Sequence, residues 1–209
     1  PVLTKVIKLF KCKVILCEKP LTSSYSKSKK IVEICNLNKI KLFVNYQRPT
    51  NPAFIDLKKR IVSNFLKPPF RCIGFYNGDY FNIGSHFVNL FDFLFGRKID
   101  FKMGKNKNDI KLIYKKGIVD ICKSPIKKLN YYEFYLNFSN AIVHIDFNNG
   151  QINYSLIDIN KIKSNKTCFI DEMTYFKYIP KHINNILNKK KHNLTSGKSS
   201  LNIFPNHKV

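Results

Sequence analysis

The chain has 209 residues, of which 44% are apolar, and this size suits one globular domain or one and a half. Its formal net charge of +24 suggests nucleic-acid binding, but only four of the 37 basic residues are arginine and the lysines are scattered. Because arginine is the residue suited to bidentate phosphate and base contacts, the composition argues against a nucleic-acid partner.

No apolar stretch is long enough to cross a membrane. Residues 87–95 are interrupted by Asn89 and Asp92, and they fall short of the ~20 helical residues that a bilayer requires. The six cysteines include no Cys-x-x-Cys pair and none at zinc-ligand spacing from a histidine, so no metal site is predicted. We therefore expect a soluble protein of the cytoplasm, a reducing compartment.

The first segment predicts part of an α/β sheet. The chain starts with Pro1 and runs directly into a strand-like segment, which resembles the cut start of something longer. A short buried strand is predicted over 13–17, and a helix capped near Ser24 and ending at about 36–38 follows. A second strand is expected over 41–46. Together they form a βαβ unit, whose two strands are parallel.

Three further helices are predicted. The first runs over 52–66, from a proline at a favourable first-turn position to the stop at Pro68-Pro69. Its apolar face is formed by Phe54, Leu57, Ile61 and Phe65. The others cover Ser85–Phe95, which glycines bound on both sides, and 177–188.

The remaining segments alternate as strands do. They are Arg71–Tyr76, Ile110–Tyr114, Ile118–Cys122, Tyr132–Phe138, Ile142–Phe147 and Gln151–Ile157. Asn149-Gly150 predicts a type I′ hairpin between the last two. The sequence therefore indicates an α/β segment followed by an α+β domain with a mostly antiparallel open sheet and helices on one face.

This pattern gives three regions. Residues 1–48 are interpreted as the carboxyl-terminal part of a Rossmann-like nucleotide-binding domain, and residues 49–188 as a substrate and oligomerisation domain. Residues 189–209 are polar and lysine-rich and are expected to form an irregular tail.

The first candidate site is Glu18-Lys19-Pro20, at the carboxyl end of a buried strand, where open α/β sheets place ligands. A partly desolvated lysine there has a lowered pKa and can bind a substrate hydroxyl and move protons. The alternative is a solvated turn residue before a proline. Taken alone, the motif favours that alternative.

The second candidate is the segment 82–89, in which Gly84 allows a tight entry and Ser85 is expected to cap a helix. His86 then lies in the first turn, where the positive end of the helix dipole favours the neutral imidazole that a base requires. The alternative is a histidine that satisfies a loop carbonyl. For a lone histidine that is the commoner case.

Together these segments resemble the Gfo/Idh/MocA oxidoreductases. The resemblance rests on Val14-Ile15-Leu16-Cys17-Glu18-Lys19-Pro20-Leu21, on Asn45-Tyr46-Gln47-Arg48 and on Gly84-Ser85-His86 with the helix that ends in Phe95-Gly96. It extends from about residue 10 to Gly96 and more loosely to about Gly197.

The resemblance implies reversible hydride transfer between nicotinamide, as NAD or NADP, and a secondary hydroxyl of a sugar, sugar nucleotide or cyclitol. By similarity, Lys19 would bind the reacting hydroxyl and His86 would exchange its proton. Glu18, Lys19 and Pro20 would contact the cofactor, and Asn45, Tyr46, Arg48 and Asn82 would line the substrate pocket.

The sequence also departs from this family. Asn82 and Asn89 occupy positions where many members carry acidic residues, and asparagine cannot stabilise an imidazolium as a carboxylate does. None of the eight glycines forms a Gly-x-Gly pair, so the pyrophosphate-binding turn is absent and the chain alone should bind a dinucleotide poorly.

Three functions follow. The first is a dehydrogenase that is truncated at its amino end and forms a homo-oligomer through the aromatic strand region 131–135 on its open sheet face. The second is a non-catalytic relative that acts as a dimerisation or binding module. The third, a nucleic-acid-binding protein, rests on charge alone and predicts salt-dependent duplex binding.

Overall fold

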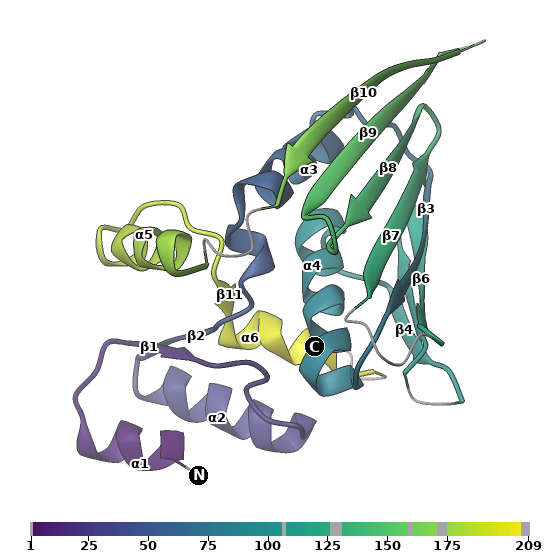
Figure 1. Cartoon of the computed structure of the whole chain (residues 1–209). Coiled ribbons are helices and arrows are strands. Elements are labelled where there is room, and N and C mark those ends of the chain that lie inside the picture. Colours follow the sequence, from purple (N-terminus) through teal and green to yellow (C-terminus); the bar gives the residue numbers. More distant parts are fainter. Residues whose placement is uncertain (1, 106–107, 126–130, 159–160, 171–174, 206–209) are drawn as a thin grey trace.

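The computed structural model describes residues 2–105, 108–125, 131–158, 161–170 and 175–205. It contains a small sheet and a large one (Figure 1). In the small sheet, β1 (Val14–Cys17) pairs in parallel with β2 (Lys41–Val44), as the βαβ pattern predicts. A third strand, β11 (Thr195–Ser196), pairs antiparallel with β2.

Helices α1 (Val2–Leu9) and α2 (Tyr25–Leu37) pack together beside the small sheet. The start of the chain is therefore helical, and the strand-like interpretation of it is wrong. Leu3 and Ile7 are spaced one helical turn apart, and this spacing brings both against the buried side chains of α2. Burial of that stripe favours the helix over an extended segment.

The large sheet has eight strands in the order β10-β9-β8-β7-β3-β6-β5-β4. Their bounds are β3 Phe70–Tyr76, β4 Asp100–Met103, β5 Ile110–Tyr114, β6 Gly117–Lys123, β7 Tyr132–Phe138, β8 Ala141–Asp146, β9 Gln151–Asp158 and β10 Lys161–Phe169. All pairs are antiparallel except β3 with β6. The mostly antiparallel sheet is thus confirmed.

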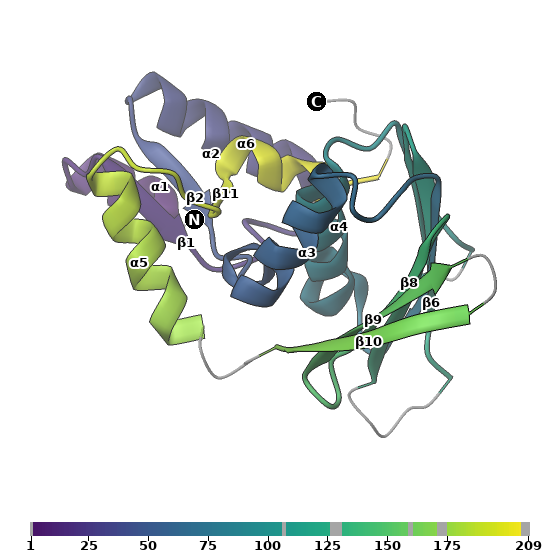
Figure 2. The same ribbon diagram turned by 90° about the horizontal axis from the view of Figure 1, so that it is seen from above.

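Two helices, α3 (Pro52–Val62) and α4 (Ser85–Phe95), cover one face of this sheet and separate it from the small sheet (Figure 2). Phe54 and Phe91 are fully buried there, and the ring of Phe87 lies 4.6 Å from that of Phe134. Burial of such large aromatic side chains supplies much of the core stability, because each removes a large apolar area from water.

Helix α3 is shorter than predicted. It ends at Val62 because Asn64 adopts a left-handed conformation with φ of 61°, which a helix cannot continue. Phe65 is therefore 43% exposed instead of lying on the buried face. The hairpin between β8 and β9 is confirmed, but its turn is not type I′, since Gly150 has a positive φ and Asn149 does not.

The segment after Lys189 is not an irregular tail. Beyond α5 (Tyr175–Leu187), the chain forms β11, a short α6 (Gly197–Ser200) and the 3₁₀ turn η4 (Leu201–Ile203). Leu194, Leu201 and Ile203 are buried against the small sheet or the residues that follow it. Isolated apolar residues among lysines and asparagines carry no periodicity, so the sequence alone did not indicate this packing.

The division at residue 48 remains a prediction. Helix α5 and strand β11, which follow the large sheet in the chain, pack against the small sheet. None of the helices in the described part of the chain is both long and apolar enough to span a bilayer.

Candidate functional site

Three segments meet beside the carboxyl ends of β1 and β2. Glu18 and Lys19 follow β1, Asn45 and Tyr46 follow β2, and His86 comes from the first turn of α4. The side-chain amide of Asn45 donates a hydrogen bond of 2.8 Å to the Glu18 carboxylate. The parallel pairing of β1 and β2 places both residues at one sheet edge, because the two strands end side by side.

Lys19 is joined to the segment before α4. Its ammonium donates to the backbone carbonyl of Asn82 at 2.6 Å and to the Asn82 side-chain oxygen at 2.9 Å. An ammonium has three N–H donors, so one remains for a further acceptor. Burial lowers the pKa of Lys19, as does the nearby positive charge of Arg48, whereas Glu18 and Asp79 act in the opposite direction.

His86 lies behind this contact. It is 9% exposed, and its ring meets that of Tyr46 edge to face, with centroids 5.5 Å apart. Its Nδ1 atom is buried and makes no hydrogen bond to the described residues. Burial lowers the pKa of His86 far below its usual value, and the charges of Arg48 and Lys19 lower it further. The imidazole is therefore neutral.

The cause of that neutrality differs from the predicted one. A π-helical turn, η2 (Tyr80–Gly84), runs directly into α4, so His86 does not lie at a free helix end. Ser85 does not cap α4 either, because its hydroxyl donates to the Phe81 carbonyl at 2.7 Å. Gly84 is required for space rather than for conformation, since a β-carbon there would lie 2.9 Å from the Tyr80 ring and 3.0 Å from the Tyr76 hydroxyl.

Arg48 is buried beneath the site. Its guanidinium carbon lies 4.7 Å from the centre of the Phe87 ring and 5.0 Å from that of Phe147. Such placement favours the cation by attraction to the aromatic faces. Burial also raises the pKa of Tyr46 to about 12, so its hydroxyl stays protonated.

Asn89 does not hold the His86 ring in place through a hydrogen bond. It exchanges hydrogen bonds with Thr195 of β11, at 3.1 and 3.3 Å. Within the described residues, neither Asn82 nor Asn89 forms a hydrogen bond that orients the His86 ring. Asn82 instead joins Lys19 to η2, and Asn89 joins the carboxyl-terminal segment to α4.

The sequence interpretation missed Asp79. Its carboxylate accepts from the backbone N–H of Asn82 at 2.8 Å and so fixes the residue that holds Lys19. Asp is a common N-cap residue, because its carboxylate can accept a hydrogen bond from a backbone N–H in the first turn. This role was not recognised, because no helical turn was predicted over Tyr80–Gly84. In the described residues, no group of three His, Cys, Asp or Glu could hold a metal ion.

Solved structures provide the comparison. The fold matches a protein described as an NADPH-dependent oxidoreductase from Desulfitobacterium hafniense with a TM-score of 0.77, at 12% identity over 97% of this chain and 70% of that one. It matches an oxidoreductase from Bacillus cereus at 0.73, with 14% identity over 97% and 73%. A third match is an Agrobacterium radiobacter oxidoreductase solved with NAD⁺, L-tartaric acid and magnesium, at 0.64, with 15% identity over 90% and 67%.

The chain has the fold of these oxidoreductases. No protein-family model matches the sequence, and no curated protein matches it. At these identities the likeness establishes the fold, including the mixed eight-stranded sheet with its helices on one face. The chemistry has to be argued from the residues themselves.

Proposed function

We propose that this chain carries the substrate-binding and proton-transferring residues of a nicotinamide-dependent oxidoreductase that acts on a secondary hydroxyl of a sugar, sugar nucleotide or cyclitol. One observation supports this above all others. A partly desolvated lysine and a neutral, buried histidine come from separate segments, and Lys19 bonds to Asn82, four residues before His86. Perturbed groups of this kind cluster at catalytic sites.

Each residue has a definite task in this proposal. Lys19 donates its remaining N–H to the substrate hydroxyl oxygen and holds the reacting carbon in place. His86, which is neutral, takes the hydroxyl proton as the carbon is oxidised and returns it in reduction. Asn45, Tyr46, Arg48 and Asn82 form the substrate wall, with Tyr46 also restricting the His86 ring.

The chain fits only the nicotinamide end of the cofactor. NAD or NADP would supply the hydride acceptor when bound, and in this proposal Glu18, Lys19 and Pro20 contact that end. The pyrophosphate needs a glycine-rich turn before a helix, but α2 starts after Ser24 and has no glycine near it. β1 pairs on one edge only among the described residues. We propose that a preceding segment of the same protein adds a parallel strand and the turn there.

Hydride transfer is the direct test. The protein as its own cell makes it would be mixed with NAD⁺ or NADP⁺ and a panel of cyclitols, sugars and sugar nucleotides, and reduced nicotinamide would be followed by absorbance. Lys19→Ala and His86→Ala should each lower kcat/KM at least about a hundredfold, the usual effect of losing a general base, while Lys30→Ala on the surface of α2 should not. Equal activity in all variants would disprove the roles.

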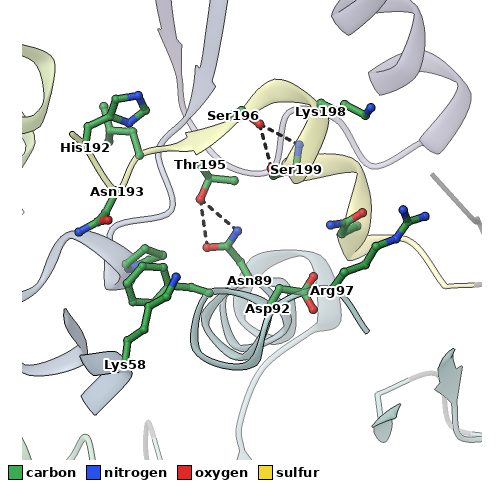
Figure 3. Close-up of a pocket in the computed structure, with 15 residues that line it drawn as sticks. Lys58, Asn89, Asp92, Arg97, His192, Asn193, Thr195, Ser196, Lys198 and Ser199 are labelled. Atoms are coloured by element: carbon green, nitrogen blue, oxygen red, sulfur yellow. Dashed lines mark hydrogen bonds between the residues drawn. The ribbon is translucent and has the colours of Figure 1, made fainter. Parts of the chain in front are cut away.

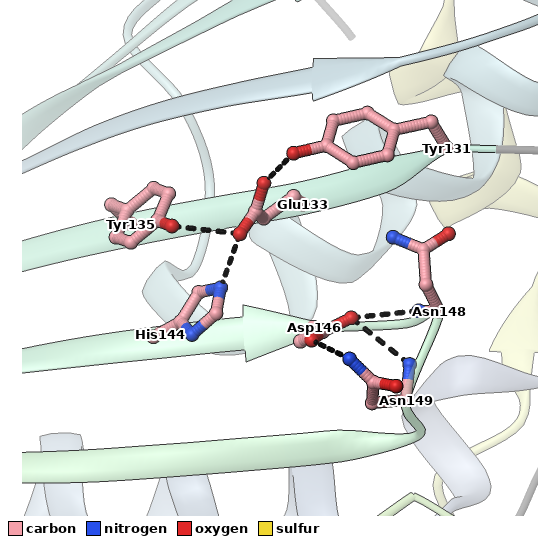
Figure 4. Close-up of polar contacts among 7 residues, drawn as sticks. All are labelled: Tyr131, Glu133, Tyr135, His144, Asp146, Asn148 and Asn149. Atoms are coloured by element: carbon pink, nitrogen blue, oxygen red, sulfur yellow. Dashed lines mark hydrogen bonds and ion pairs between the residues drawn. The ribbon is translucent and has the colours of Figure 1, made fainter.

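The open face of the large sheet supports assembly with a second copy. Figure 4 shows the Tyr135 and His144 side chains of this face, both bonded to Glu133. Ile73, Tyr135 and His144 lie in one row across β3, β7 and β8, with the first two 43% and 39% exposed. The ring of Tyr135 stacks on His144 at 4.4 Å, and Glu133 bonds both side chains, so this surface is held in one conformation.

The same face carries both signs of charge, for example in the Arg71–Asp120 ion pair at 2.9 Å, which suits contact with an identical surface. We propose a homodimer through it. Sedimentation of the unmodified protein should give twice the chain mass. Ile73→Glu should give monomers, whereas Val62→Glu, at the exposed end of α3, should not. A concentration-independent monomer would exclude the interface.

A non-catalytic binding module is the second candidate. It is favoured by Asn89, which bonds Thr195 rather than supporting the histidine. Dimerisation without turnover on any substrate of the panel would establish it.

The six cysteines are all unpaired, and this supports the proposal of a reducing, cytoplasmic location.

A further inference from the structure

An open cavity lies away from Lys19 and His86 (Figure 3). It has a volume of about 500 Å³ and is lined by residues of α3, of α4 and of the segment 192–202. Its size falls within the range of small-molecule sites. The floor is formed by Asn89 and Asp92 of α4, and Figure 3 shows Lys58 on one side of them and Arg97 on the other.

The cavity is positively charged. Lys58, Arg97 and Lys198 all line it, and Asp92 is the one carboxylate among the described lining residues. That carboxylate is already satisfied by Lys98 at 2.7 Å and by the Tyr114 hydroxyl at 2.9 Å. The charge of Asp92 is therefore offset by Lys98, and the lining as a whole carries more basic than acidic side chains, which favours an anion.

Two polar groups in the wall have no hydrogen-bond or ion-pair partner among the described residues. The Nδ1 atom of His192 is buried and makes no hydrogen bond to the described residues. Lys58 is half-buried with its ammonium 4.1 Å from the Phe93 ring centre, and no described carboxylate forms an ion pair with it. Burial and the charge of Lys191 lower the pKa of Lys58. Buried polar groups left in this condition commonly mark the place of a ligand or water.

We propose that this cavity binds the phosphate group of a small phosphorylated molecule. Arg97 offers a planar fork and Lys58 and Lys198 offer point charges, which are the two ways in which proteins hold phosphate. The Ser199 hydroxyl accepts from the Ser196 hydroxyl at 2.8 Å, so its own hydrogen remains for an oxygen atom of the ligand. The site does not depend on the proposed dehydrogenase chemistry.

Inorganic phosphate is the probe for this site. Amide spectra of the full chain would be recorded by NMR during a phosphate titration at constant ionic strength. Saturable shifts are expected at Thr195, Ser196 and Ser199. Arg97→Gln and Lys198→Gln should each weaken binding about five- to tenfold, the effect of losing one charge-assisted hydrogen bond.

Lys30→Gln is the matched control, because it removes the same charge from an exposed position on α2. It should leave phosphate affinity unchanged. An equal loss in all three variants, or shifts confined to the neighbourhood of Lys19, would overturn the proposal. Thermal unfolding of each variant would verify that the fold is intact, and the exposed positions of Arg97 and Lys198 favour this.

Discussion

The ammonium group of Lys19 is held by two oxygen atoms of Asn82, at 2.6 and 2.9 Å, although the residues are 63 positions apart in the chain. This contact links the end of β1 to the turn that precedes α4. It therefore fixes the distance between the lysine and His86, on which the proposed proton transfer depends.

Asn82→Asp should raise the pKa of Lys19. A carboxylate at the position of the amide oxygen stabilises the charged ammonium, which burial now disfavours. Titration of lysine side-chain NMR signals would measure the change. Asn38→Asp, at the end of α2, adds the same charge far from the site and should leave Lys19 unaffected; a similar response to both substitutions would contradict the direct contact.

Acid should destabilise the fold through His86. Its pKa is lowered in the folded state, so below about pH 6.5 the unfolded chain binds a proton that the folded chain does not. Stability is therefore retained above this pH and lost as pH falls. As pH falls from 7 to 5, the lowered pKa of His86 should reduce the free energy of unfolding by about 2 kcal/mol. In urea titrations, the His86→Gln variant should lose less stability between pH 7 and 5 than the unmodified protein. The same pH dependence in both proteins would contradict the role of His86.

Arg48→Met should raise the pKa of His86, because Arg48 is the nearby charge that most disfavours the imidazolium. It should also lower stability by about 1 to 2 kcal/mol, through loss of the contacts with Phe87 and Phe147. Histidine NMR titration and chemical denaturation measure the two effects. Lys30→Met, on the exposed surface of α2, serves as the control and should change neither.

Gly74→Ala should destabilise the large sheet. A β-carbon at this position would overlap the Phe134 ring and lie 2.8 Å from the Glu133 carbonyl oxygen, so β3 and β7 would have to separate. Overpacking of this kind costs about 1 to 3 kcal/mol. Val62→Ala, which truncates a side chain that is 74% exposed, should cost less than Gly74→Ala. Denaturant midpoints of the two variants would decide, and equal losses would refute the clash.

Local elements could be predicted from the amino-acid pattern wherever the apolar periodicity was strong. The βαβ unit, the helix from Ser85 to Phe95 and the strands Ile110–Tyr114 and Tyr132–Phe138 follow from periodicity and glycine boundaries. The candidate residues Lys19 and His86 were also recognisable, because each stands at the end of such an element. Their spatial proximity was an expectation drawn from a resemblance, and their catalytic roles remain predictions.

Features that depend on residues distant in the chain could not be predicted in this way. Strands β4 and β10 form at the two outer edges of the large sheet, where the neighbouring strand rather than their own sequence supplies the hydrogen bonds. The return of Thr195 to β2 likewise needs a partner about 150 residues earlier. The neutral state of His86 has the same origin, since burial by Tyr46 and the charge of Arg48 exist only once the segments have met.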